Sequence, residues 1–108
     1  MKYFNYKDEN LTSENVSIAD IATEVQTPFY CYSANAFKNN FNALKNAFKE
    51  INPKICYATK SNSNLSILNL LQKEGAGADV VSVGELKKSL IAGIMPHDIV
   101  FSGVGKTS

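Results

Sequence analysis

The sequence of 108 residues predicts an α/β fold that forms the N-terminal part of a (β/α)8 TIM barrel. Short apolar segments typical of strands alternate with amphipathic segments typical of helices, and the connections are short, as in βαβ units of a parallel sheet. The last apolar segment has no helix after it, although parallel strands are normally covered on both faces. A complete barrel needs about 250 residues. We therefore expect the chain to be the beginning of a larger protein.

The N-terminal third contains less regular patterns. Residues 1–16 have irregularly spaced apolar residues and predict one or two short strands or an extended arm. Residues 18–25 carry apolar side chains on one helical face, and Ser17 is a plausible helix cap. Pro28 ends this element and precedes a short aromatic strand at 29–33.

The rest of the chain alternates helices and strands. A long helix over 33–51 is indicated by its spacing of phenylalanine and leucine, with Ser33 as its cap. Asn64 caps the next predicted helix, and Ser82 with Glu85 has the spacing of a capping box for the one after it. The predicted elements from residue 54 onward are a strand at 54–60, a helix at 64–75, a strand at 78–83, a helix at 82–93 and a strand at 98–103.

The composition excludes several classes of protein. Hydrophobic residues make up 44%, charged residues 19%, and the net charge is +1, so neither disorder nor a nucleic-acid surface is indicated. The opening segment has no apolar signal, and no apolar run reaches membrane-spanning length, so we expect a cytoplasmic protein without a membrane partner. Cys31 and Cys56 are interpreted as buried free thiols, and His97 as a loop residue, so no metal site is expected.

Lys60 is the first candidate for chemistry. If the strand at 54–60 is regular, Cys56, Ala58 and Lys60 point to the same side. The lysine would then project from the carboxyl end of a barrel strand, where barrel enzymes place catalytic residues. Apolar surroundings would disfavour the ammonium form and leave an amine able to form imines. The alternative is a solvated lysine at the start of a loop.

Asp79 is the second candidate. It shares a face with Val81 and Val83 in the predicted strand at 78–83, although aspartate is a poor strand former. If this strand is the neighbour of the strand at 54–60, Asp79 could reach the region of Lys60. The alternative is a solvent-exposed turn residue at the start of the strand.

The C-terminal segment SGVGKTS raises a different possibility, a nucleotide-binding P-loop. That motif requires a glycine five residues before the glycine at position 105, because its backbone N–H groups wrap the phosphates. Val100 occupies the required position, and a β-branched residue does not fit so tight a loop. A P-loop protein would bind nucleotide at 103–107 and give Lys60 no role.

Three collinear segments indicate a family. YATKSNSN (57–64) resembles the Y-A-x-K-[AS]-N segment of the fold-type III pyridoxal-phosphate decarboxylases. GAGADVVSVGELKKSLIAG (75–93) and IVFSGVGKT (99–107) resemble the two segments that follow it in that family. The resemblance covers roughly residues 18–108, and the three segments are most similar to the members that decarboxylate meso-diaminopimelate to L-lysine.

The resemblance implies a cofactor and a set of site residues. Lys60 would be the catalytic lysine that carries pyridoxal 5'-phosphate as an internal aldimine, and Asp79 and Ala58 would also bind the cofactor. Lys106 lies where many relatives have F-x-G-x-x-K, and its role stays open. No nucleotide is needed on this interpretation. Ornithine, arginine or carboxynorspermidine decarboxylases and a non-catalytic cofactor-binding relative remain alternatives.

The resemblance also implies a domain organisation and partners. Residues 1–16 would belong to a β-rich second domain and residues 17–108 to the first portion of the cofactor-binding barrel. The expected partners are a small amino-acid substrate and, for the full-length protein, a second copy in a homodimer. We expect residues 1–108 alone to be inactive and poorly stable, since an open barrel exposes a strand edge.

Overall fold

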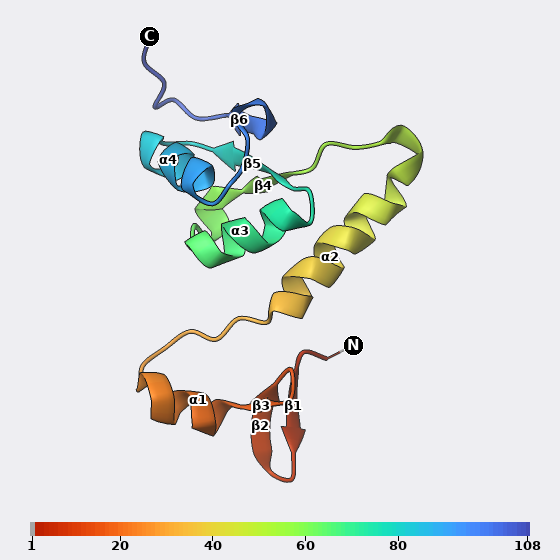
Figure 1. The fold of residues 1–108 in the computed structure, drawn as a ribbon, viewed down its shortest axis with the longest axis vertical. Helices are drawn as coiled ribbons and strands as arrows, with labels where there is room; N and C mark the ends of the chain where they lie inside the picture. Colours follow the sequence, from red (N-terminus) through yellow and green to blue (C-terminus); the bar gives the residue numbers. More distant parts are fainter. Residues whose placement is uncertain (1) are drawn as a thin grey trace. The chain divides into compact units, whose positions relative to one another are not determined.

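The computed structural model describes residues 2–108 (Figure 1). These residues form two compact units that divide after Phe37. The first unit contains an antiparallel sheet with strand order β1-β2-β3. Both of its connections are two-residue turns, Asp8–Glu9 and Glu14–Asn15, with positive φ at each residue, as type I′ hairpin turns require. The elements of this unit are β1 (Phe4–Lys7), β2 (Asn10–Ser13), β3 (Val16–Ser17) and α1 (Ile18–Val25).

Helix α1 follows β3 directly and begins where the sequence predicts. The Ser17 hydroxyl accepts a hydrogen bond from the Asp20 N–H at 3.4 Å. The predicted strand at 29–33 is wrong, because this extended segment pairs with no strand among residues 2–108. Its aromatic residues suggested a strand, but a strand also needs a hydrogen-bonded neighbour. Tyr30 is instead 89% exposed, and its ring stacks on that of Tyr32 with centroids 6.3 Å apart.

The start of helix α2 (Ala34–Ala47) is capped by two residues from different parts of the first unit. The hydroxyl of Ser33, the predicted cap, accepts from the Ala36 N–H at 3.1 Å. The Glu14 carboxylate accepts from that same hydroxyl at 2.9 Å and from the Asn35 N–H at 2.7 Å. A carboxylate at a helix N-terminus satisfies free N–H groups and opposes the positive end of the helix dipole. The second β-turn therefore contributes to the start of α2.

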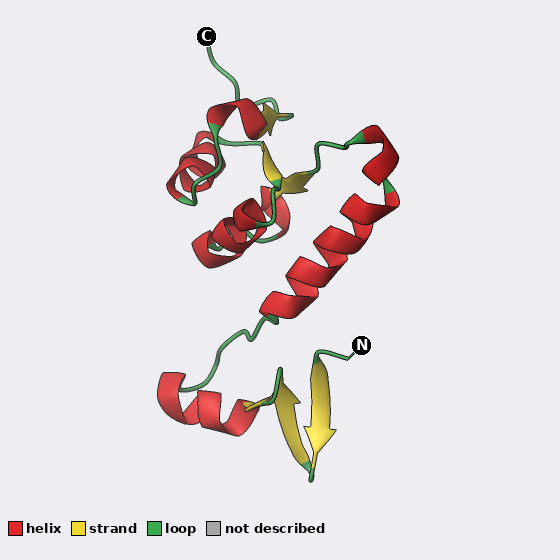
Figure 2. Cartoon of the chain, turned by 45° about the vertical axis from the view of Figure 1, so that its right-hand side comes forward, coloured by secondary structure: helices red, strands yellow, loops and turns green. Residues whose placement is uncertain are grey.

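The second unit contains a parallel sheet with strand order β4-β5-β6, as the alternation of strands and helices predicts. Helices α3 and α4 connect successive strands and lie side by side in both views (Figures 1 and 2). Short 3₁₀ turns lie at Lys49–Ile51, Thr59–Ser61 and Pro96–Asp98. The regular elements are β4 (Cys56–Ala58), α3 (Leu65–Lys73), β5 (Gly77–Val80), α4 (Val83–Ile91) and β6 (Ile99–Phe101).

The strands are shorter than the apolar segments that predicted them. β4 ends at Ala58, and the 3₁₀ turn begins at the next residue, so the alternation of strand faces does not extend to Lys60. β5 ends at Val80, because Ser82 already caps α4 by accepting from the Glu85 N–H at 3.1 Å. The prediction that Lys60 points to the same side as Cys56 and Ala58 is therefore wrong. The prediction that Asp79 shares a strand face with Val81 and Val83 is wrong for the same reason.

The core of the second unit lies on one face of the parallel sheet. Ala78 and Val80 are fully buried and cluster with Ile94. Asp79 points to the opposite face, since successive strand residues alternate. Its register partners Ala58 in β4 and Val100 in β6 share that face. The partly buried side chains that pack on the core are Leu86, Ile99 and Phe101.

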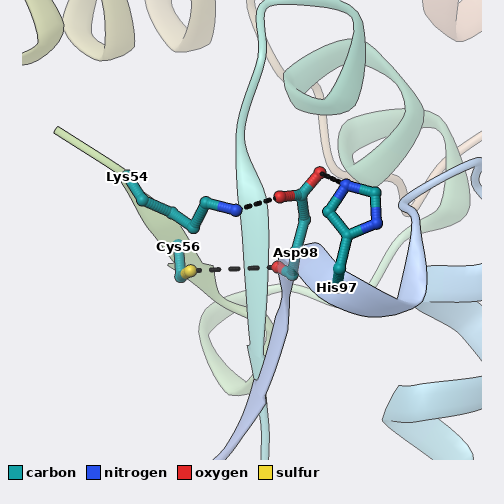
Figure 3. A network of polar contacts seen from close by, with 4 residues as sticks. All are labelled: Lys54, Cys56, His97 and Asp98. Carbon is teal, nitrogen blue, oxygen red and sulfur yellow. Dashed lines mark hydrogen bonds and ion pairs between the residues drawn. The ribbon is translucent and has the colours of Figure 1, made fainter. Parts of the chain in front are cut away.

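The amino edge of this sheet is held by contacts with the turn before β6 (Figure 3). The Lys54 ammonium forms an ion pair with the Asp98 carboxylate, and His97 Nε2 lies 3.5 Å from the other carboxylate oxygen. The hydrogen bond from Lys54 holds the pKa of Asp98 below its ordinary value. Cys56 Sγ lies 3.9 Å from the Asp98 carbonyl oxygen, and burial raises the pKa of this thiol.

The ion pair at this edge makes stability depend on pH. Because the pKa of Asp98 is lowered in the fold, its ion pair with Lys54 stabilises the protein above the ordinary aspartate pKa of about 4. This contribution is lost as the pH falls through the lower pKa of the folded state. We expect a small effect, since the Lys54 side chain is 57% exposed. Thermal midpoints measured from about pH 6 to about pH 3 should converge for the wild type and Asp98→Asn.

A matched variant tests the cause of this pH dependence. Lys54→Met removes the cation that lowers the Asp98 pKa, so its midpoint should follow that of Asp98→Asn above about pH 4. A constant difference between the wild type and Asp98→Asn over the whole range would contradict the assignment.

Candidate active site

The candidate site lies at the carboxyl edge of the parallel sheet. Three strands run in the same direction, so the residues that follow them meet at one edge. Lys60 follows β4, and Ser102 follows β6, where its N–H donates to the Val80 carbonyl at 3.1 Å. Asp79 lies in β5 between them, opposite Ala58 in β4. Catalytic residues of barrel enzymes lie at this edge.

Lys60 occupies the middle of the 3₁₀ turn Thr59–Ser61 and is exposed. Its ammonium has no hydrogen-bond or ion-pair partner among residues 2–108. The backbone after the turn is held by the Tyr57 hydroxyl, which donates to the Asn62 carbonyl at 3.0 Å. The Asn62 side chain in turn accepts from the Asn64 N–H at 3.0 Å, one residue before α3. The turn is thus anchored while the lysine side chain is left available.

Asp79 is held by a partner that the sequence did not indicate. Its Oδ1 accepts a hydrogen bond from the Ser102 hydroxyl at 2.5 Å. Strand pairing places Asp79 opposite Ala58, two residues before Lys60. The expectation that the strand before Lys60 and the strand of Asp79 are neighbours is therefore confirmed. The Asp79 side chain is partly exposed, on the sheet face away from the core.

Glu85 connects three elements at this edge. Its Oε1 accepts from the Val81 N–H at 3.0 Å and from the Thr59 hydroxyl at 2.5 Å. The Ser82–Glu85 capping box is confirmed on the serine side, while the glutamate binds the N–H one residue before the cap. Sequence spacing identified Glu85 as a capping residue but gave no sign of its contact with Thr59.

The C-terminal glycines pack against Val81, the residue that follows β5. A Cβ at Gly103 would lie 2.9 Å from the carbonyl oxygen of Val81, and one at Gly105 would lie 3.2 Å from the same atom. Glycine is therefore needed here for close approach to Val81, which favours the rejection of the P-loop interpretation. Lys106 is exposed beside these residues.

Other expected features can be compared with the described residues. Cys31 and Cys56 are free cysteines, but both are partly exposed and not buried as expected. No group of three or more His, Cys, Asp or Glu side chains among residues 2–108 could hold a metal ion. Within the same range, no helix has the length and apolarity needed to cross a membrane.

Comparison with known proteins identifies relatives along nearly the whole chain. Residues 34–108 match the family described as "Pyridoxal-dependent decarboxylase, pyridoxal binding domain". A diaminopimelate decarboxylase of Vibrio cholerae is 46% identical over 108 residues, which cover 99% of this chain and 26% of that protein. A crystal structure from Aquifex aeolicus matches with a TM-score of 0.91 and 47% identity, over 97% of this chain and 26% of that chain. A crystal structure of a diaminopimelate decarboxylase of M. jannaschii in co-complex with L-lysine matches with a TM-score of 0.91 and 35% identity. The match covers 98% of this chain and 26% of that chain.

The chain belongs to the pyridoxal-dependent decarboxylases, and residues 34–108 correspond to their pyridoxal-binding domain. This confirms the family that the three sequence segments indicated, and pyridoxal phosphate is the cofactor that this domain implies. The structural matches also support the α/β architecture of the N-terminal part of a barrel enzyme. The chain spans about a quarter of the length of the curated relatives it matches, 26% for the Vibrio cholerae protein.

Proposed function

We propose that the protein decarboxylates meso-diaminopimelate to L-lysine and carbon dioxide, with pyridoxal 5'-phosphate bound covalently through Lys60. The observation that carries the proposal is the position of Lys60, which lies at the carboxyl edge of the sheet within the region that matches a pyridoxal-binding domain. The relatives at 46% and 35% identity named diaminopimelate decarboxylase support this substrate. One of them was solved with L-lysine, the product of this reaction.

The residues at this edge fit the proposed cofactor. The Lys60 amine is exposed and has no hydrogen-bond partner among residues 2–108, so it is available to condense with an aldehyde. When bound, pyridoxal phosphate supplies that aldehyde and a conjugated ring that accepts the electrons of a breaking carbon–carbon bond. Ala58 has a small side chain on the same sheet face as Asp79.

The roles of the chain's own residues follow from this arrangement. Lys60 would hold the cofactor until the amino group of the substrate replaces it, and would then be a free amine at the site. Asp79, oriented by the Ser102 hydroxyl, would place a carboxylate on the face that carries Ala58. Such a fixed carboxylate would favour a positive charge on the cofactor. The full-length protein would act on a small amino acid as a homodimer.

The proposal is tested on the protein expressed from its complete reading frame. After incubation with pyridoxal phosphate and reduction with borohydride, peptide mapping by mass spectrometry should find the pyridoxyl group on Lys60 alone. Release of carbon dioxide from meso-diaminopimelate should exceed release from ornithine and from arginine. A label spread over surface lysines would refute the role of Lys60. A label on Lys60 with turnover of ornithine would keep the site and correct the substrate.

A further inference from the structure

A buried hydroxyl lies directly beside the candidate lysine. Thr59 begins the 3₁₀ turn, and its exposed surface is 0%, whereas the next residue, Lys60, is exposed. The turn therefore has one residue fixed in the interior and its neighbour in solvent. Because one peptide bond joins the two residues, contacts that fix the Thr59 side chain also restrict the backbone of Lys60.

The Thr59 hydroxyl has two acceptors and a single proton. It lies 2.5 Å from Glu85 Oε1 and 3.0 Å from the Asp79 carbonyl oxygen. The shorter contact is to a carboxylate, and hydrogen bonds to ionised acceptors are shorter and stronger than those between neutral groups. Threonine is also stiff at χ1, so its hydroxyl direction and its backbone are coupled. The hydrogen bond from the Thr59 hydroxyl consequently holds the 3₁₀ turn against the Glu85 carboxylate.

Glu85 is itself fixed at the start of α4. Its backbone N–H donates to the Ser82 hydroxyl at 3.1 Å, and its Oε1 accepts from the Val81 N–H at 3.0 Å. The carboxylate thus joins the end of β5, the start of α4 and the turn after β4. A helix cap alone needs only the first two of these elements, so the contact with Thr59 requires a separate explanation.

We infer that Thr59 and Glu85 form a positioning pair that holds the Lys60 turn in the orientation needed to link the cofactor. This inference rests on the proposed function of Lys60. Neither residue is a catalytic residue in it, because both act through the backbone of the turn. Without the pair, the turn has more freedom, and the lysine amine meets the cofactor aldehyde less often in a reactive geometry.

The test compares Thr59→Val with Thr59→Ser in the full-length holoenzyme. Valine has the shape of threonine but donates no proton, whereas serine keeps the hydroxyl and loses one methyl group. The measured quantity is the ratio of Lys60-linked to unlinked cofactor at saturating pyridoxal phosphate, from absorbance and from borohydride trapping. We expect this ratio to fall about tenfold in Thr59→Val, as for loss of a hydrogen bond to a charged group, and to stay within about twofold in Thr59→Ser.

This readout separates positioning from folding. A structural role would lower the thermal midpoint of Thr59→Val and leave the linked fraction of the folded, saturated protein unchanged. That result would overturn the inference and leave the proposed function intact. Absence of a Lys60 label in the wild type would overturn both.

Glu85→Ala provides an independent variant that removes the acceptor instead of the donor. It should lower the linked ratio at least to a similar extent, since it also removes the acceptor of the Val81 N–H. Thr59→Val combined with Glu85→Ala should be no worse than Glu85→Ala alone, because the shared Thr59–Glu85 hydrogen bond is already lost. If Thr59→Val does not fold, the ratio of Lys60-linked to unlinked cofactor in Glu85→Ala still tests the positioning role. Additive effects in the double variant would contradict a shared contact.

Discussion

Lys60→Ala is expected to lower decarboxylation by more than about a thousandfold in the full-length protein, since it removes the only covalent attachment proposed for the cofactor. The side chain contributes little to the fold, because it is exposed and has no hydrogen-bond partner among residues 2–108. The thermal midpoint of the unliganded protein should therefore stay close to that of the wild type. The measurements are carbon dioxide release from meso-diaminopimelate and borohydride trapping followed by peptide mapping.

A suitable control is Lys87→Ala, which removes an exposed lysine from α4 and should leave both activity and labelling unchanged. Activity within about tenfold of the wild type in Lys60→Ala would show that the cofactor is held in another way. Lys106→Ala gives a second comparison, since it retains the Lys60 label if the two lysines have separate roles.

Gly77→Ala is expected to destabilise the protein by about 3 kcal/mol, the upper end of the cost of overpacking. A Cβ at this position would lie 2.3 Å from the Asp98 carbonyl oxygen and 3.0 Å from Cys56 Sγ. The nearer atom belongs to the backbone, so the contact is relieved only if β5 and the turn before β6 move apart. That movement also disturbs the pairing at the amino edge of the sheet. Urea unfolding of the full-length protein gives the free energy of unfolding.

Gly84→Ala is the matched control for this prediction. Gly84 lies in the first turn of α4, and the nearest atom to an added Cβ is Ser82 Oγ at 3.8 Å. Because alanine has the higher helix propensity, this variant should be neutral or stabilising by up to about 1 kcal/mol. Equal losses of stability in the two variants would point to a general intolerance of the larger side chain and contradict the steric explanation.

The starts of the helices could be predicted well from the sequence because their caps are local signals, whereas the helix predicted over 33–51 ends at Ala47. Ser17, Ser33, Asn64 and Ser82 each accept a backbone N–H at the start of the predicted helix. The strands of the second unit were predicted too long, since apolar residues continue into the turns and caps that end them. In the first unit, one or two short strands were predicted and three are present. The segment at 29–33 failed for another reason, because strand formation depends on a pairing partner that no local pattern reveals.

The candidate site was predictable only in part. The motif around Lys60 and the spacing to Asp79 indicated two residues that strand pairing brings to one edge. Ser102 was missed, because its contact with Asp79 arises from the register of β6 and has no local signature. The position of Lys60 on the β4 face was predicted wrongly, since the 3₁₀ turn interrupts the alternation.

The capping of α2 by Glu14 has a consequence for synthesis of the chain on the ribosome. Glu14 precedes Asn35, whose N–H it binds, by 21 residues. At translation rates of about 5–20 residues per second, it emerges about one to four seconds earlier. Hairpins form in about 1–10 μs, so the turn that presents Glu14 can open and close many times in this interval. The turn that presents Glu14 is thus sampled before the first N–H groups of α2 are made.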